Sequence, residues 1–211
     1  MWQKLGKGKG LLNSKSNQKN GSEGAGAPGV GLSVPKSLVL VGMMGAGKTA
    51  IGRRLATRLD LPFTDVDIEI ETAAGCSIAD FFEDYGEEEF RDGERRVIKR
   101  LLGDGVGVLA TGGGAFMDPG TRDEIARQGI SIWLKADLET LWQRVNRRDT
   151  RPLLKTSNPR QTLSDLLDAR YPVYADADIT VVSTDGPPEA MVSKVVEAVE
   201  TFLTEENTEH G

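Results

Sequence analysis

Residues 38–59, LVLVGMMGAGKTAIGRRLATRL, begin as an apolar run and end as an amphipathic helix pattern. Between the two, the segment from Gly42 to Thr49 fits the phosphate-loop pattern G-x-x-x-x-G-K-[ST], with the strand before it and the helix after it that this pattern requires. Glycines let backbone N–H groups close around phosphate oxygens, and the start of the following helix adds the positive end of its dipole. The alternative, a tight glycine turn with an incidental lysine, explains neither flank. We therefore predict a site for a nucleoside triphosphate.

The residues of this loop have distinct expected roles. Lys48 is expected to neutralise the β- and γ-phosphates, and Thr49 to bind Mg²⁺ through its hydroxyl. The motif alone does not separate a kinase from a GTPase, a motor or a transport ATPase, although the sequence contains no Asn/Thr-Lys-x-Asp element for guanine. We expect the triphosphate to be bound by Gly45, Ala46, Gly47, Lys48, Thr49 and Ala50.

Strand and helix patterns alternate along the chain. Short runs rich in Val, Ile and Leu predict strands buried on both faces at 37–42, 62–66, 106–110, 131–136 and 178–183. Helical patterns follow the phosphate loop, begin again at Ser77, and recur at 87–102, 118–128, 137–147, 160–172 and 187–204. This alternation predicts an α/β fold of three layers, α/β/α, with a five-stranded parallel sheet whose ligands gather at the carboxyl ends of the strands.

The two ends of the chain differ from the rest in composition. Six lysines and one glutamate give residues 1–36 a net charge of +5, whereas the whole chain carries −6, so residues 37–211 carry −11. We predict a disordered basic tail at 1–36, a folded domain at 37–204 and a disordered tail at 205–211. A nucleic-acid-binding arm is the alternative for the first tail, but we expect no nucleic-acid partner.

Several classes of protein are disfavoured by what the sequence lacks. Cys76 is the only cysteine, which excludes an internal disulfide. No apolar run approaches the ~20 residues of a membrane span, and the beginning of the sequence lacks the apolar core of a signal peptide. We expect a cytoplasmic protein with no membrane partner. The only histidine is His210, so any catalysis must rest on carboxylates, lysine, arginine and backbone amides.

Two carboxylates follow the second predicted strand. Asp65 and Asp67 flank Val66 within PFTDVDIEIE. Placed at the end of a strand, they could hold Mg²⁺ through water and accept a hydrogen bond from an acceptor hydroxyl. They could equally cap the next helix and complement its dipole. The residues alone leave both interpretations open.

A possible second anion site comes from a helix and a glycine run. Arg91 and Glu94 stand three residues apart in a helical pattern, where they can pair, and a paired guanidinium is well placed to grip a carboxylate or phosphate. An exposed helical ion pair is the commoner case. The glycines at 112–114 follow the third strand and permit close approach of a ligand to the main chain, whereas a mobile turn is the alternative.

A later segment, WQRVNRRDTRPLL, is rich in arginine. A basic lid at about 147–160 would exclude water from a triphosphate and add positive charge, with Arg151 as the best candidate. Arg170 lies late in the next helical pattern, close to the fifth strand.

Taken together, these motifs are similar in order and spacing to those of the shikimate kinase family, over residues 37–203. The resemblance rests on GMMGAGKT, F-x-D-x-D, EEFRDGE, the GGG run, RPLL and ARYPVY. It implies a P-loop fold of the nucleoside-monophosphate-kinase type. It also implies transfer of the γ-phosphoryl group of ATP to the 3-hydroxyl of shikimate, with Mg²⁺, in the pathway to chorismate and aromatic amino acids.

The resemblance further implies roles for individual residues. Asp67 would orient the attacking hydroxyl, Lys48 and Arg151 would act on the phosphates, and these three form the predicted catalytic set. Thr49 and Asp65 would form the metal site, because the third strand ends without the aspartate usual in P-loop enzymes. Arg144 and Arg151 would contact the nucleotide. Shikimate would be bound by Asp67, Arg91, Gly112, Gly113, Gly114 and Arg170.

Two rival interpretations remain. The first is a kinase of the same fold that acts on another polyol acid, such as gluconate, or on a nucleotide. The second is a nucleotide-binding regulator that has lost its chemistry, which the presence of both aspartates and both arginines disfavours. We expect the partners to be ATP and shikimate, and the protein to be a monomer.

Overall fold

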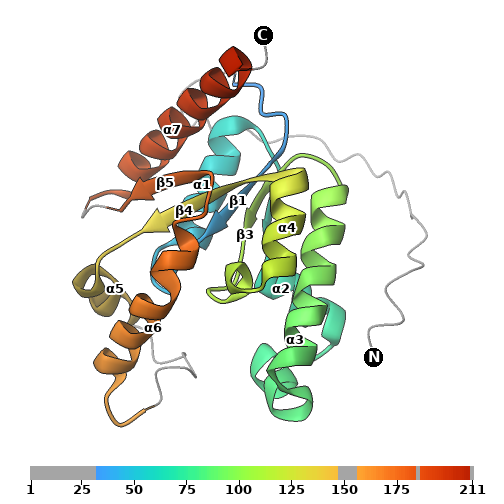
Figure 1. Ribbon diagram of the computed structural model, residues 1–211, viewed down its shortest axis with the longest axis vertical. Helices are drawn as coiled ribbons and strands as arrows, with labels where there is room; N and C mark the ends of the chain where they lie inside the picture. Colours follow the sequence, from blue (N-terminus) through green and yellow to red (C-terminus); the bar gives the residue numbers. More distant parts are fainter. Residues whose placement is uncertain (1–31, 147–155, 184–185, 210–211) are drawn as a thin grey trace, which may run out of the picture.

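A five-stranded parallel sheet forms the centre of the molecule (Figure 1). The computed structural model describes residues 32–146, 156–183 and 186–209. The strands stand in the order β2–β3–β1–β4–β5, so the strand before the phosphate loop is the middle one. Their bounds are β1 Ser37–Val41, β2 Phe63–Asp65, β3 Val108–Ala110, β4 Gly129–Lys135 and β5 Ile179–Val182. The predicted parallel sheet is confirmed.

The register of the strands places three chain segments side by side. Leu40 of β1 pairs with Ala110 of β3, which in turn pairs with Asp65 of β2. Because parallel strands end at the same edge, the segments that follow these residues emerge together. These segments are the phosphate loop, the glycine run and the aspartate pair.

Helices cover both faces of the sheet (Figure 1). Helices α1 (Lys48–Leu59) and α7 (Pro188–Glu209) pack together on one face, and α3 (Ile78–Gly103) and α4 (Pro119–Gln128) pack together on the other. The remaining helices are α2 (Val66–Ala74), the one-turn η2 (Ala115–Met117), α5 (Leu138–Val145) and α6 (Pro159–Tyr174). Within the described residues, no helix combines the length and the apolar character needed to cross a membrane.

Strands β1, β3 and β4 are almost entirely buried, as predicted, whereas β2 is half-buried along its three residues. Val39 and Leu40 of β1 are completely buried, as is Ile132 of β4. This burial explains the unbroken apolar runs, since each strand meets helices above and below. Only β5, at one edge, alternates buried and exposed residues.

The structure differs from the sequence prediction at several boundaries. The two helical patterns predicted from Ser77 and at 87–102 are confirmed as the two parts of α3, which a break at Gly86, with φ of 80° and ψ of 177°, separates. Other boundaries moved. Residues 205–209, predicted to be a disordered tail, belong to α7, where Asn207 donates a hydrogen bond to the carbonyl of Leu203. Leu32 and Val34, predicted to lie in the first tail, are half-buried against the core.

The arginine-rich segment lies largely outside the described residues. Its predicted lid at 147–160 includes residues 147–155, which are not described. The last two residues of that range, 159–160, begin α6 instead, because Asn158 accepts a hydrogen bond from the backbone N–H of Gln161 and caps the helix.

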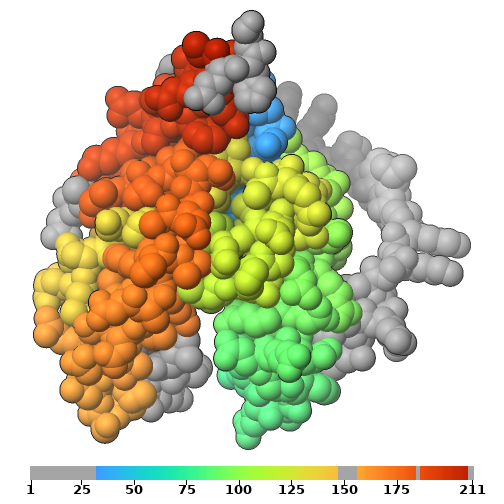
Figure 2. Space-filling model, in the orientation of Figure 1, coloured from blue at the N-terminus to red at the C-terminus, as the bar shows by residue number. Residues whose placement is uncertain are grey.

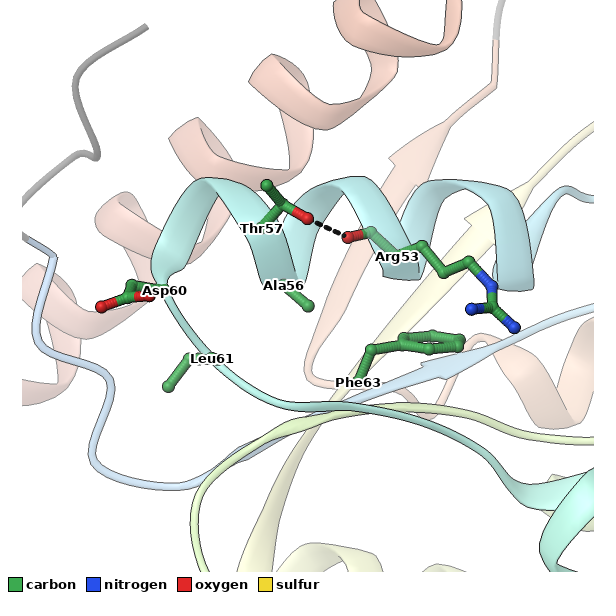
Figure 3. A pocket seen from close by; sticks show the side chains of 6 residues that line it. All are labelled: Arg53, Ala56, Thr57, Asp60, Leu61 and Phe63. Carbon is green, nitrogen blue, oxygen red and sulfur yellow. Dashed lines mark hydrogen bonds between the residues drawn. The ribbon is translucent and has the colours of Figure 1, made fainter. Parts of the chain in front are cut away.

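The molecule has a notch in its surface (Figure 2) and, elsewhere, a separate cavity. The surface is notched between the first turns of α3 and the first part of α6 (Figure 2). A separate cavity of about 410 Å³ lies at the opposite end of α1 from the phosphate loop, where the guanidinium of Arg53 stands 4.9 Å from the ring centre of Phe63 (Figure 3). The sequence motifs gather at the end of α1 that begins with Lys48, so the notch is the candidate site.

Candidate functional site

Backbone geometry shapes the phosphate loop. Gly42, Gly45 and Gly47 all have positive φ, at 130°, 83° and 94°. Side chains are also excluded by space, because a Cβ atom at Gly42 would lie 2.9 Å from the carbonyl oxygen of Leu134. The loop therefore needs glycine for conformation and for its close approach to β4.

Lys48 lies folded back over this loop. Its ammonium donates hydrogen bonds to the carbonyl oxygens of Gly42, at 2.7 Å, and Met43, at 3.0 Å. The residue is only 9% exposed, although it is the first residue of α1. Gly47 is the N-cap without a capping side chain, and the first turn of this described helix has no acidic residue. The positive end of the dipole and the ammonium thus face the same loop, which favours an anion.

The metal candidates Thr49 and Asp65 are in contact. The hydroxyl of Thr49 donates a hydrogen bond of 2.8 Å to Asp65 Oδ2. The other oxygen of Asp65 accepts the backbone N–H of Asp67 and caps α2. Asp65 is therefore a helix cap, as one of the two interpretations held, and it also faces the phosphate loop.

This pair suits a magnesium ion that arrives with a nucleotide. Mg²⁺ prefers hard oxygen ligands and usually takes one or two from protein, with waters and phosphate oxygens completing the shell. A hydroxyl and a carboxylate 2.8 Å apart supply such ligands. Among residues 32–146, 156–183 and 186–209, no group of three or more His, Cys, Asp or Glu side chains gathers as a metal cage.

Asp67 points from α2 towards the glycine run. A Cβ atom at Gly112 would lie 2.7 Å from Asp67 Oδ1 and 3.2 Å from Glu94 Oε1, so both carboxylates face this glycine. Burial and the neighbouring Asp65 carboxylate raise the pKa of Asp67, against the opposing effect of the Lys48 ammonium. A partly desolvated carboxylate of raised pKa is suited to accept a proton.

Arg91 and the buried Glu94 form an ion pair on α3. Arg91 Nη1 donates to Glu94 Oε2 at 2.5 Å, and Glu94 is 1% exposed, which excludes the exposed ion pair as an interpretation. Arg91 also donates to the exposed Glu87 one turn earlier. Burial raises the pKa of Glu94 to about 7, while Arg91 opposes that rise. Glu94 Oε1 has no hydrogen-bond partner in the described part of the chain.

The glycine run lies between the two halves of the site. A Cβ atom at Gly113 would lie 3.4 Å from the backbone nitrogen of Met44, in the phosphate loop. Arg170 Nη1 of α6 donates to the carbonyl oxygen of Gly113 at 3.0 Å. A Cβ atom at Gly114 would lie 2.3 Å from Arg91 Nη2. Hence two guanidinium groups and the phosphate loop all lie against one short stretch of main chain. These contacts hold the glycine run in place, which disfavours the alternative of a mobile turn.

The two arginines that were predicted to contact the nucleotide from outside the phosphate loop are Arg144 and Arg151. Arg144 of α5 donates to the hydroxyl of Ser183, which follows β5, at 3.2 Å. Arg151 lies outside the described residues. The phosphate-loop residues, the aspartate pair, the glycine run, Arg91 and Arg170 are brought together at the carboxyl edge of the sheet.

Sequence analysis missed two contacts of the site. It assigned no role to Glu87, the second partner of Arg91, or to Tyr174, whose hydroxyl donates to the same Gly113 carbonyl as Arg170. Spacing carried a signal in both cases, because each lies four residues from the arginine with which it acts and so shares its helix face.

The chemistry that this arrangement favours is transfer of a phosphoryl group to an anionic, hydroxylated acceptor. The phosphate loop and Lys48 provide an anion site for a nucleotide. Across the glycine run, Arg91 and Arg170 provide positive charge for a second anion, and Asp67 provides an acceptor for a hydroxyl proton. Phosphoryl transfer asks a protein chiefly for such positioning and charge neutralisation.

Comparison with known proteins agrees with this chemistry. Residues 44–200 match the profile of the family described as "Shikimate kinase". The shikimate kinase of Paramagnetospirillum magneticum is 55% identical over 175 residues, which cover 83% of this chain and 90% of that protein. The shikimate kinase of Rhizobium meliloti is 56% identical over 164 residues, covering 78% and 85%. Among solved structures, the shikimate kinase of Acinetobacter baumannii in complex with shikimate has a TM-score of 0.75 and 39% identity, covering 79% of this chain and 93% of that one.

Proposed function

The chain belongs to the shikimate kinase family, and on this premise we propose that it transfers the γ-phosphoryl group of ATP to the 3-hydroxyl of shikimate. The products are ADP and shikimate 3-phosphate. The observation that carries the proposal is the stretch Gly113–Gly114, which touches the phosphate loop on one side and the guanidinium groups of Arg170 and Arg91 on the other. When these arginines bind the carboxylate of shikimate, the ring of shikimate lies beside the bound triphosphate.

The described acceptor residues complement the groups of shikimate. Its carboxylate matches the guanidinium groups of Arg91 and Arg170, since a guanidinium fork binds carboxylate with two parallel hydrogen bonds. Its hydroxyls match the carboxylate of Asp67 and the main chain of Gly112 to Gly114. Gluconate and nucleoside monophosphates also carry anions, and they remain the rival acceptors.

Transfer is direct and in line. The oxygen of the 3-hydroxyl forms a bond to the γ-phosphorus while the bond from that phosphorus to the bridging oxygen of ADP breaks. Asp67 accepts a hydrogen bond from the attacking hydroxyl and takes its proton late, which its raised pKa supports. Lys48 neutralises charge on the phosphates, with Arg151 assigned the same role from the sequence motif.

Metal and nucleotide contacts complete the proposed site. Thr49 and Asp65 are the residues that would hold Mg²⁺, which when bound neutralises phosphate charge. Gly45, Ala46, Gly47, Lys48, Thr49 and Ala50 are assigned to the triphosphate. Arg144, held by Ser183, is assigned to the base.

A coupled assay of ADP release tests the proposal. The purified protein is supplied with ATP and Mg²⁺ and with shikimate, gluconate or a nucleoside monophosphate in parallel. ADP release that depends on shikimate, with a kcat/KM at least about a hundredfold above the other acceptors, is expected, because only shikimate matches both arginines and Asp67. Preference for another acceptor supports the first rival. ATP binding without any acceptor-dependent turnover supports the regulator.

Organisation outside the site follows from the same premise. We propose a cytoplasmic monomer with one catalytic domain, in which the basic segment at 1–31 takes no part in catalysis. Sedimentation velocity of the full chain should give a single species of 22.8 kDa. Deleting residues 1–31 should leave kcat and both Michaelis constants unchanged within twofold.

A further inference from the structure

Tyr174 is a fully buried tyrosine at the end of α6, four residues after Arg170. Its ring stacks against Phe116 of η2 and Trp133 of β4, with ring centres 6.3 and 5.8 Å apart. Its hydroxyl donates a hydrogen bond to the carbonyl oxygen of Gly113. Burial raises the pKa of Tyr174 to about 12, so the hydroxyl keeps the proton that it donates.

The carbonyl that Tyr174 binds belongs to a shared peptide. Arg170 donates to the same oxygen from one turn earlier on α6. The peptide group is planar, so fixing the Gly113 carbonyl also fixes the plane that continues into Gly114. Gly114 is the residue against which Arg91 rests. One peptide plane therefore sets the relative placement of both guanidinium groups.

One aromatic neighbour of Tyr174, the indole of Trp133, also contacts the phosphate loop. A Cβ atom at Gly42 would lie 3.2 Å from Trp133 Cδ1, so the indole packs directly under the first glycine of the loop. The ring of Tyr174 stacks on the same indole at an interplanar angle of 29°. Its ring thus contacts the support of the phosphate loop, and its hydroxyl contacts the glycine run.

The structure assigns Tyr174 as a positioning residue for the acceptor: it holds the Gly113 carbonyl so that Arg170 and Arg91 face the same carboxylate. This assignment rests on the proposed function. It gives Tyr174 no contact with the nucleotide and no part in proton transfer, because Tyr174 is fully buried and its hydroxyl donates to the Gly113 carbonyl.

Tyr174→Phe tests the assignment, with Tyr171→Phe as the matched control. Tyr171 lies on the same helix, packs edge-on against the same Trp133, and donates its hydroxyl to a carbonyl as well, but that carbonyl is Ala136, after β4. Both variants lose one hydroxyl and keep the ring. The assay measures kcat and the Michaelis constants for shikimate and ATP, together with Tm.

Tyr174→Phe is expected to raise the Michaelis constant for shikimate about three- to tenfold, the effect of one lost hydrogen bond. The Michaelis constant for ATP should change less than twofold. Tyr171→Phe should change neither constant, although both variants lower Tm. A second measurement combines Tyr174→Phe with Arg170→Lys, and the two effects should not be additive, since the side chains share one acceptor oxygen.

Three results would overturn the assignment: an unchanged shikimate constant in Tyr174→Phe, equal changes for both substrates, or the same change in both tyrosine variants. The wild-type assay separates these results from a failure of the proposed function. If wild-type protein shows no turnover with shikimate, the function fails. If it turns over and Tyr174→Phe behaves like Tyr171→Phe, only the positioning role fails.

Discussion

The two halves of the cleft are built from different materials. On the phosphate side, three glycines of positive φ shape the main chain, and the ammonium of Lys48 is held by two carbonyl oxygens of the loop itself. On the acceptor side, the groups are side chains from α2, α3 and α6 that meet only in the folded state. On this side burial raises the pKa of two carboxyl groups, Asp67 and Glu94.

This difference separates what each half can tolerate. A loop made of main chain keeps its shape so long as its glycines remain, and its partner, a triphosphate, is common to many enzymes. Under the proposed function, selectivity for the acceptor depends on how accurately two guanidinium groups and two carboxylates are placed. We therefore expect substitutions on the acceptor side to affect the two substrates differently: ATP binding should stay intact while the use of shikimate is lost.

The largest difference between the effects on shikimate turnover and on ATP binding is expected for Asp67→Asn. The amide keeps the shape of the side chain but cannot take the proton of the attacking hydroxyl, so kcat should fall about a hundredfold or more. ATP binding, measured by equilibrium dialysis, should change less than threefold. The control is Asp84→Asn, an exposed aspartate on α3. Near-normal turnover in Asp67→Asn would remove Asp67 from the chemistry.

Arg91→Lys should act next most strongly, and on the Michaelis constant for shikimate. Lysine keeps the charge and loses the fork that can hold both Glu94 and a substrate carboxylate, so the constant should rise about tenfold. Arg96→Lys, an exposed arginine on the same helix, is the matched control. An unchanged shikimate constant would count against Arg91 as the carboxylate ligand.

Gly114→Ala should have a smaller effect on the same constant. The new methyl group would lie 2.3 Å from Arg91 Nη2, so the guanidinium must move off its preferred rotamer, and the shikimate constant should rise about threefold. Gly103→Ala, where a methyl group meets nothing within 4 Å, should leave kinetics unchanged. If the two alanine variants behave alike, Arg91 does not depend on the glycine run.

The smallest effect is expected on stability and depends on pH. Glu94 has a pKa of about 7 in the folded state against 4.5 for the ordinary carboxyl. Between these values the folded state binds more protons than the unfolded state, so the contribution of Glu94 to stability falls as pH rises. From pH 5 to pH 8, wild type should lose about 1 to 3 kcal/mol of unfolding free energy relative to Glu94→Gln. Urea unfolding of both proteins at the two pH values measures this difference, and parallel changes would contradict it.

Sequence reasoning succeeded best where local pattern and local structure coincide. The strand–glycine–helix pattern from residue 38 to 59 predicts the centre of the fold, and the five apolar runs predict all five strands of the described sheet. Their bounds moved by one or two residues. The predicted last helix ended at residue 204 because residues 205–209 are polar. In the structure α7 extends to Glu209, and the side chains of Asn207 and Thr208 donate hydrogen bonds to the preceding turn.

The acceptor side was harder to read because its properties arise from packing. The spacing of Arg91 and Glu94 indicated a pair, but it could not show that Glu94 is buried or that Asp67 faces the same glycine. Nor could it show that a tyrosine holds the Gly113 carbonyl. Such contacts join segments that are distant in the sequence, as Asp67 is from Gly112 and Tyr174 is from Gly113, and the fold of the sheet and its helices brings them together.

The order of the strands has a consequence for synthesis. Strand β1 is made first but stands in the middle of the sheet, between β3, about 70 residues later, and β4, about 90 residues later. The phosphate loop rests on Trp133 and Leu134 of β4. A nascent chain therefore cannot complete this loop until β4, which ends at Lys135, has left the ribosome, so ATP can stabilise the fold only after the residues up to β4 have emerged.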